Sequence, residues 1–262
     1  GEEVYQTLPK SANTAYTEFG VPGPASVETL RSFIPEDELF PPKRGTTWES
    51  HHAFGSWIGE TWLSPDTLEH YFGRTDSLES LVERGQWLQS EGYKCIYEEA
   101  RRQKPVCSMA LNWCFNEPWP AAANNSLISW PTVPKPAYYA VQASCRPVLA
   151  SARIPKFSWQ EGEWFESELW LLNDTWERIA PGRMEIVLEC GSFRKRLMVW
   201  EMPEALPNRN VRGPTVRFQL PAMDSDRLIL LLRIEGKPEW NSEYLLLMKA
   251  REEKQRVNML NI

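Results

Sequence analysis

The chain has 262 residues, of which 42% are hydrophobic and 12% aromatic, enough for packed cores in one large domain or two ordinary ones. Its formal net charge is -6 and its Lys and Arg residues are dispersed, which argues against the basic surface that nucleic-acid binding requires. No apolar run reaches the roughly 18 residues of a membrane-spanning helix, so neither nucleic acid nor a membrane span is expected.

The five cysteines show neither the spacing of a metal site nor the density of a disulfide scaffold. Two of them, Cys107 and Cys114, lie in an apolar run and are expected to be small buried residues. The opening "GEEVYQTLPK" has no Met and no signal pattern, so we expect a piece of a longer protein. The compartment and the oligomeric state stay open, although a signal peptide on the full protein would favour a periplasmic or extracellular location.

The first predicted elements are a strand and a short helix. The run "NTAYTEFG" is β-prone up to Glu18 and is broken by the Gly and Pro residues of 20–24. "SVETLRSFI" at 26–34 then has helical spacing, with Ser26 as a candidate N-cap and Pro35 as the stop.

The clearest helix is predicted for residues 78–102. Asp76 and Glu79 form a candidate N-terminal capping pair, and Pro105 prevents continuation. Gly85 and Gly92 each cost about 1 kcal/mol relative to Ala inside a helix. We therefore expect close packing of a neighbouring segment against them.

A strand is predicted at 106–115, "VCSMALNWCF", followed by a helix at 135–145, "KPAYYAVQASC". Alternation places the bulky residues of that strand on one face and the small ones on the other, which suits a strand between a filled barrel interior and a covering helix. Strand, helix, strand and helix in this order resemble the end of a repeating βα pattern.

The second half has a different period. Alternating segments predict strands near 147–154, 164–173, 183–190, 193–200, 214–220, 227–235 and 243–248, with a hairpin at Gly191-Ser192. About seven short strands in a hundred residues are typical of an immunoglobulin-like β-sandwich. The predicted fold class is therefore α/β plus all-β, with residues 1–146 as the βα part, 147–250 as the sandwich and 251–262 as a polar tail.

Several motifs together resemble a known family. "YTEFGVPGPASVETLRSFIP" is similar to the segment around the catalytic nucleophile of glycoside hydrolase family 2, in the branch of β-mannosidases and exo-β-glucosaminidases. The likeness continues through "WESHHAF", "YFG", "LVERGQWLQSEGYKCIYEEARRQKP", "LNWCFNEPWP" and "PKPAYYAVQASCRPVL", and so covers residues 14–149 in order and spacing. It implies the C-terminal portion of a (β/α)8 TIM barrel, holding the last two βα units, followed by a sandwich domain.

The resemblance also implies an activity, namely retaining, exo-acting hydrolysis of terminal β-linked sugars of mannose or glucosamine type. Glu18 in Thr-Glu-Phe-Gly would be the nucleophile that forms a glycosyl-enzyme intermediate. A retaining mechanism needs a second carboxyl group about 5 to 5.5 Å away as the proton donor. In the family this donor precedes the nucleophile by more residues than the seventeen that precede Glu18 in this chain. We therefore expect the chain alone to be inactive. Its expected partner is the missing N-terminal part of the same enzyme.

The motif Asn116-Glu117-Pro118 resembles the acid motif of related barrel glycosidases, but Glu117 follows Glu18 in the chain instead of preceding it. Its expected role is to order the loop or to touch the sugar from the side, together with Asn116. The family uses the Trp at position 113 as a platform beneath the sugar, because an aromatic face contacts the C–H face of a pyranose.

Other aromatic and polar side chains are candidates for the same cleft. Trp119 and Trp48 are expected as possible lining residues, and His52 as a group that reaches a sugar hydroxyl. His51 and His52 have no companions at ligand spacing, so no metal and no cofactor is expected.

Two further hypotheses about the function stay open. The Trp content and the sandwich also fit a non-catalytic carbohydrate-binding or interaction module. The departures "FNEPWPAAANN" and "SWPTVPKP" leave room for a degenerate glycosidase paralogue.

Overall fold

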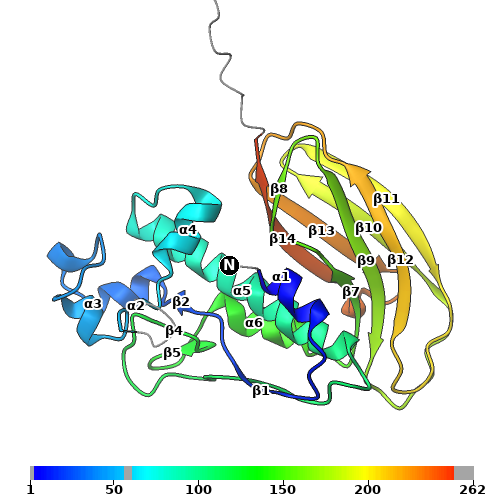
Figure 1. Ribbon diagram of the computed structural model, residues 1–262, viewed down its shortest axis with the longest axis horizontal. Helices are drawn as coiled ribbons and strands as arrows, with labels where there is room; N and C mark the ends of the chain where they lie inside the picture. Colours follow the sequence, from blue (N-terminus) through cyan, green and yellow to red (C-terminus); the bar gives the residue numbers. More distant parts are fainter. Residues whose placement is uncertain (1–2, 56–60, 251–262) are drawn as a thin grey trace, which may run out of the picture.

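The computed structural model of the chain describes residues 3–55 and 61–250; the expected polar tail at 251–262 lies outside this part. A helical region built from the first half of the chain lies on one side of the molecule, and two β-sheets built from the second half lie on the other (Figure 1). The long helix α5 runs between them, so it determines how the two regions meet.

The helical region contains six α-helices, one pair of 3-10 turns and six short strands among the described residues. The helices and turns are α1 (Val4–Thr7), η1 (Leu8–Lys10), α2 (Val27–Arg31), η2 (Glu36–Glu38), α3 (Thr47–Ser50), α4 (Pro65–Phe72), α5 (Leu78–Arg102) and α6 (Pro136–Ser144). The strands are β1 (Tyr16–Phe19), β2 (Gly23–Pro24), β3 (Ala110–Asn112), β4 (Ala123–Asn124), β5 (Ile128–Ser129) and β6 (Val133–Pro134).

Helix α5 begins and ends where its sequence pattern predicts. The cap differs, because Ser77 accepts the hydrogen bond from Ser80 N at 3.1 Å and Asp76 stands outside the cap. A Ser hydroxyl in extended backbone reaches the third amide directly, which satisfies one of the free N–H groups of the first turn. The prediction of Asp76 as the cap is therefore wrong.

The two glycines of α5 mark close approaches, as expected. A Cβ at Gly85 would lie 2.6 Å from Pro24 Cδ, and one at Gly92 would lie 3.0 Å from Val21 Cγ1. Both neighbours belong to the loop segment that follows β1 and includes the two-residue strand β2. The missing side chains thus let this loop lie directly on α5, and the position of the loop depends on the helix.

Strands β1 and β3 form a two-stranded parallel sheet, with Tyr16 opposite Ala110 and Phe19 opposite Asn112. The predicted strand at 106–115 is much shorter than expected, because only 110–112 has a strand to pair with among the described residues. Its bulky residues are exposed, so they do not fill an interior in this chain; these are Met109, Leu111, Trp113 and Phe115.

The second half forms two sheets packed face to face. The strands are β7 (Val148–Arg153), β8 (Ser158–Gln160), β9 (Trp164–Asn173), β10 (Gly182–Cys190), β11 (Phe193–Met202), β12 (Val211–Gln219), β13 (Arg227–Ile234) and β14 (Ser242–Lys249), with η3 (Pro238–Trp240) between the last two. One sheet has the order β11-β10-β13-β14-β8 and the other β12-β9-β7. All neighbours are antiparallel except β14 and β8, which are parallel.

Alternate residues of these strands fill the space between the sheets. Leu169 and Leu171 of β9 meet Ile186 and Leu188 of β10 and Leu230 of β13 in one buried cluster. Each fully buried Leu or Ile side chain contributes about 2 kcal/mol of hydrophobic stabilisation. The expected strands are found here, and the short β8 is an addition that its sequence did not reveal.

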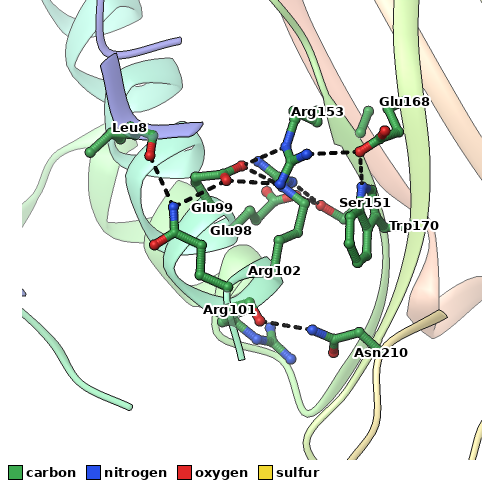
Figure 2. Close-up of polar contacts among 12 residues, drawn as sticks. Leu8, Glu98, Glu99, Arg101, Arg102, Ser151, Arg153, Glu168, Trp170 and Asn210 are labelled. Atoms are coloured by element: carbon green, nitrogen blue, oxygen red, sulfur yellow. Dashed lines mark hydrogen bonds and ion pairs between the residues drawn. The ribbon is translucent and has the colours of Figure 1, made fainter. Parts of the chain in front are cut away.

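A buried polar network joins α5 to the sandwich (Figure 2). Glu99 accepts from Arg102 Nε at 2.8 Å and from Arg153 Nη2 at 2.9 Å, and Ser151 Oγ donates to Glu98 Oε1 at 2.6 Å. Burial opposes ionisation of Glu99, but the two Arg residues outweigh it and lower its pKa. Trp87 of α5 adds a second link. Its ring is buried in the sandwich core, and its indole N–H donates to Leu245 O at 2.8 Å.

Candidate functional site

Glu18 lies on β1, on the face directed away from α5. The neighbouring Phe19 packs against Tyr97 and Tyr93 of α5, with ring centroids 5.2 and 6.1 Å apart. The register with β3 shifts between Tyr16 and Phe19, and in this stretch Thr17 and Glu18 are both exposed whereas Tyr16 and Phe19 are partly buried. It is exposed, and none of the described residues forms a hydrogen bond or ion pair with its carboxylate. This carboxylate is therefore accessible to a ligand.

Trp113 follows β3 and lies on the same face as Glu18. Its backbone N–H donates to Phe19 O at 2.9 Å, so the ladder between the two strands extends to this residue. The preceding Asn112 faces α5, since Tyr97 donates its hydroxyl to Asn112 Oδ1 at 2.6 Å. Alternation then directs Trp113 to the open face, where the side chain is 56% exposed.

Glu117 lies elsewhere, in a buried polar network with Ser126, Trp130 and Lys135. It is 3% exposed. Its Oε1 accepts a very short hydrogen bond from Ser126 Oγ and lies 3.5 Å from Lys135 Nζ, and its Oε2 accepts from Trp130 N at 3.2 Å. Both oxygens are engaged by the protein. In this chain the geometry fits the expected ordering of the loop, and it gives no support to proton donation or contact with a sugar.

Lys135 is the partner of Glu117, and sequence reasoning did not single it out. Its ammonium group is buried and also donates to Ser126 Oγ at 3.1 Å and to Gly23 O and Asn124 O, each at 3.3 Å. Burial lowers the pKa of Lys135 to about 8, although Glu117 opposes this effect. The ammonium group thus connects strand β2 to the segment 116–130, which includes β4. The only signal in the sequence was a Lys between two Pro residues.

The two histidines are held by ring stacking and by backbone oxygens. His51 lies between Phe33 and Trp119, with centroids 4.6 and 4.8 Å away, and its Nδ1 is 2.7 Å from Pro120 O. His52 stacks on Trp62 at 5.0 Å, and its Nδ1 is 2.9 Å from Ala123 O. One ring nitrogen of each residue therefore holds the loop, and no residue in the described part of the chain forms a hydrogen bond with the other.

The remaining candidates differ in exposure. Trp119 is 44% exposed and stacks on His51. Asn116 is exposed and forms an isolated parallel β-bridge with Ile128. Trp48 is fully buried and donates its indole N–H to Glu38 O at 2.9 Å. Trp48 is thus a core residue, and the expectation that it lines a cleft is wrong.

Of the two cysteines expected to be buried, Cys107 is buried and Cys114 is only partly so.

Two further features of the described residues concern metal ligands and membrane spans. Residues 3–55 and 61–250 contain no group of three or more His, Cys, Asp or Glu side chains placed to hold a metal ion. None of the helices in that part combines the length and apolar composition that crossing a membrane requires. The open face of β1 and β3, with Glu18 and Trp113, is the feature that brings together the two main candidates from the sequence.

The chain is similar to known carbohydrate-active enzymes in sequence. No protein-family profile matches it. β-mannosidase B of Aspergillus niger is 26% identical over 223 residues, which cover 79% of this chain and 25% of that protein. β-mannosidase B of Aspergillus flavus is 27% identical over 198 residues, which cover 71% of this chain and 22% of that protein. The chain thus spans about a quarter of the length of these relatives.

Solved structures agree with the sequence comparison. The β-D-mannosidase of Dictyoglomus thermophilum matches 94% of this chain and 29% of its own, with a TM-score of 0.70 and 22% identity. The exo-chitosanase CsxA of Amycolatopsis orientalis, in complex with PNP-β-D-glucosamine, matches 90% of this chain and 28% of its own, with a TM-score of 0.68 and 16% identity. At these identities the likeness establishes the fold. The expected resemblance to the β-mannosidase and exo-β-glucosaminidase branch of glycoside hydrolase family 2 is confirmed.

Proposed function

We propose that this chain is part of the catalytic unit of a retaining, exo-acting β-glycosidase that removes terminal mannose- or glucosamine-type sugars. The observation that carries the proposal is the placement of Glu18 and Trp113 on one open face, at the ends of two paired parallel strands. In barrel enzymes the reacting groups lie at this end of the strands. The β-mannosidases and the exo-chitosanase to which the chain is similar agree with this substrate class.

In the proposed mechanism, Glu18 acts as the nucleophile and Trp113 as the platform for the sugar ring. An ionised carboxylate attacks the anomeric carbon as the leaving group departs, and water then hydrolyses the glycosyl-enzyme ester. The exposed position of Glu18 suits a group that must reach substrate. Trp113 presents an apolar ring face, against which the C–H groups of a pyranose pack.

We further propose that residues 1–146 are the last two βα units of a TIM barrel and that residues 147–250 are an immunoglobulin-like sandwich. The parallel pair of β1 and β3, with α5 between them in sequence and α6 after them, fits this order. The bulky residues exposed beside the pair, such as Leu111 and Phe115, suit an interface with further barrel strands. The remaining part of the enzyme would supply those strands.

The chain alone should be inactive under this proposal, because the family resemblance implies a proton donor that precedes Glu18 by more residues than this chain contains ahead of it. Glu117 is the one candidate from the sequence, and its oxygens are engaged by Ser126, Lys135 and Trp130. A donor carboxyl from the remaining part of the enzyme would complete the pair about 5 to 5.5 Å from the nucleophile.

The test uses the protein expressed from its complete reading frame, beside the 262-residue chain. The substrates are 4-nitrophenyl β-D-mannopyranoside and 4-nitrophenyl β-D-glucosaminide. Glu18→Ala should lower kcat by at least about 10³-fold, and azide should restore turnover because it replaces the carboxylate. A 2-deoxy-2-fluoro glycosyl fluoride should label the peptide that contains Glu18, as found by mass spectrometry.

Glu28→Gln is the matched control, since Glu28 is an exposed carboxylate on helix α2, ten residues further along the chain. It should leave turnover unchanged. Normal turnover by Glu18→Ala, or a label on another peptide, would remove Glu18 as the nucleophile. Turnover by the 262-residue chain alone would contradict the need for an external donor.

A further inference from the structure

Tyr97 of α5 contacts both strands that carry the proposed site residues. Its ring packs edge-on against Phe19 of β1, with the centroids 5.2 Å apart and the ring planes at 73°. Its hydroxyl donates to Asn112 Oδ1 of β3 at 2.6 Å. Glu18 directly precedes Phe19 and Trp113 directly follows Asn112. One side chain of the helix therefore contacts the chain neighbour of each proposed site residue.

Asn112 extends this contact to the backbone around Trp113. Its amide nitrogen donates to Cys114 O at 3.0 Å, so the side chain of Asn112 spans the position of Trp113. A backbone carbonyl accepts only from the amide nitrogen, which leaves Oδ1 of Asn112 for the Tyr97 hydroxyl. A single orientation of the amide group satisfies both partners, and Tyr97 helps to fix that orientation.

The backbone of Trp113 is thus held from two sides. The N–H of Trp113 donates to Phe19 O at 2.9 Å, and the carbonyl of the next residue, Cys114, accepts from Asn112. Trp113 is 56% exposed, so neighbouring side chains restrain its indole less than they would restrain a ring in a packed core. The direction in which the indole leaves the chain therefore depends on the hydrogen bonds at 112–114.

The Tyr97 hydroxyl keeps its proton well above neutral pH. Burial raises the pKa of Tyr97 to about 12, so the group remains a donor. Asn112 is only partly exposed, and loss of the hydroxyl would leave its Oδ1 without this donor. The orientation of the amide, and with it the bond to Cys114 O, would then be less well defined.

We infer that Tyr97 is a positioning residue for the sugar platform: through Asn112, its hydroxyl holds the backbone at Trp113 so that the indole lies beneath the sugar. The inference rests on the proposed function and deepens it. Tyr97 acts through another residue and has no part in the chemical step. A displacement of a substrate-positioning group by about 1 Å can lower the rate on the order of 10²-fold, so a smaller shift of the indole is measurable.

The test is a double-mutant cycle in the protein expressed from its complete reading frame. The substrate is 4-nitrophenyl β-D-mannopyranoside or 4-nitrophenyl β-D-glucosaminide, whichever the wild-type enzyme hydrolyses faster. Tyr97→Phe removes the hydroxyl and keeps the ring against Phe19. It should lower kcat/KM by about five- to twentyfold in the wild-type background, but by less than about twofold in a Trp113→Ala background, where the platform is already absent. Asn112→Leu should have the same effect, and combining it with Tyr97→Phe should cost no more than either change alone.

Tyr93→Phe is the matched control. Tyr93 lies on the same helix and also packs on Phe19, but its hydroxyl donates to Asn125 O. Any loss of kcat/KM in this variant should be the same with and without Trp113→Ala, because the two changes are independent.

The cycle separates positioning from a general loss of folded enzyme, which would lower kcat/KM by the same factor in both backgrounds. Such an equal factor for Tyr97→Phe and for Asn112→Leu, or unchanged kcat/KM in both variants, would overturn the inference while Glu18→Ala still tests the proposed function by itself. Failure of the proposed function gives a different result: the wild-type enzyme then hydrolyses neither substrate, and the inference falls with it.

Discussion

The buried pair Glu117–Lys135 permits a sharp test of how the candidate site is held together. Both side chains are 1% exposed, and Lys135 Nζ lies 3.5 Å from Glu117 Oε1. At this separation two unit charges attract by about 5 kcal/mol if the effective dielectric constant is about 20. Much of this is offset by the cost of removing both charges from water, so the pair contributes little net stability while each charge depends on the other.

We therefore expect Lys135→Met to lower the free energy of unfolding by about 3 to 5 kcal/mol, because it leaves Glu117 as an unpaired buried charge. Glu117→Gln should also be destabilising, since it leaves the Lys135 ammonium without its carboxylate. The double variant should be much less destabilised than the sum of the two single variants. Urea unfolding near neutral pH, followed by Trp fluorescence and circular dichroism, measures all four species of this cycle.

A second readout of the same pair is its pH dependence. The pKa of Lys135 falls from 10.5 to about 8 in the folded chain, a difference that corresponds to about 3 kcal/mol. The folded state releases this proton before the unfolded state does, so the penalty is complete below about pH 8 and is relieved as the pH rises towards 10.5. Wild-type chain should gain stability relative to Lys135→Met across that interval.

The control is the partly exposed pair Lys156–Glu163, whose charged atoms lie 2.7 Å apart. Lys156→Met and Glu163→Gln should show a coupling below about 1 kcal/mol, because water screens exposed charges. Additive effects of Lys135→Met and Glu117→Gln, or a coupling no larger than that of the control, would refute the argument.

Two further predictions concern α5. Gly85→Ala should destabilise the chain by about 1 to 3 kcal/mol in urea unfolding, because the new Cβ would lie 2.6 Å from Pro24 Cδ. At an unhindered helix position the same change stabilises, so a more stable variant would contradict the close approach. Glu99 has a lowered pKa because the ion pairs with Arg102 and Arg153 outweigh its burial, so its stabilisation is present above the usual carboxyl pKa and is lost as the pH falls through the lower folded value. Glu99→Gln should therefore be less stable than wild type near neutral pH and should lose less stability than wild type on acidification. A urea midpoint of the variant that falls with pH as steeply as in wild type would exclude Glu99 as a source of acid sensitivity.

Sequence periodicity by itself determined most of the regular elements. The span of α5, the strand at 164–173 and the turn between β10 and β11 follow from spacing and from local stop signals, because they depend on residues a few positions apart. The close approach at Gly85 and Gly92 was also predictable, since a glycine inside a helix needs a compensating reason.

The tertiary structure alone decided what the polar residues of the site do. Asn116-Glu117-Pro118 resembled an acid motif in the sequence, and Glu117 was expected to order the loop or to touch the sugar; in the fold, Lys135 and Ser126 engage its carboxylate from positions 18 and 9 residues away. Glu18 has no such partner among the described residues and is exposed, while Trp113 comes close to β1 through the pairing of β1 with β3. Burial and charge pairing arise from contacts between distant segments, and local patterns do not encode which segments meet.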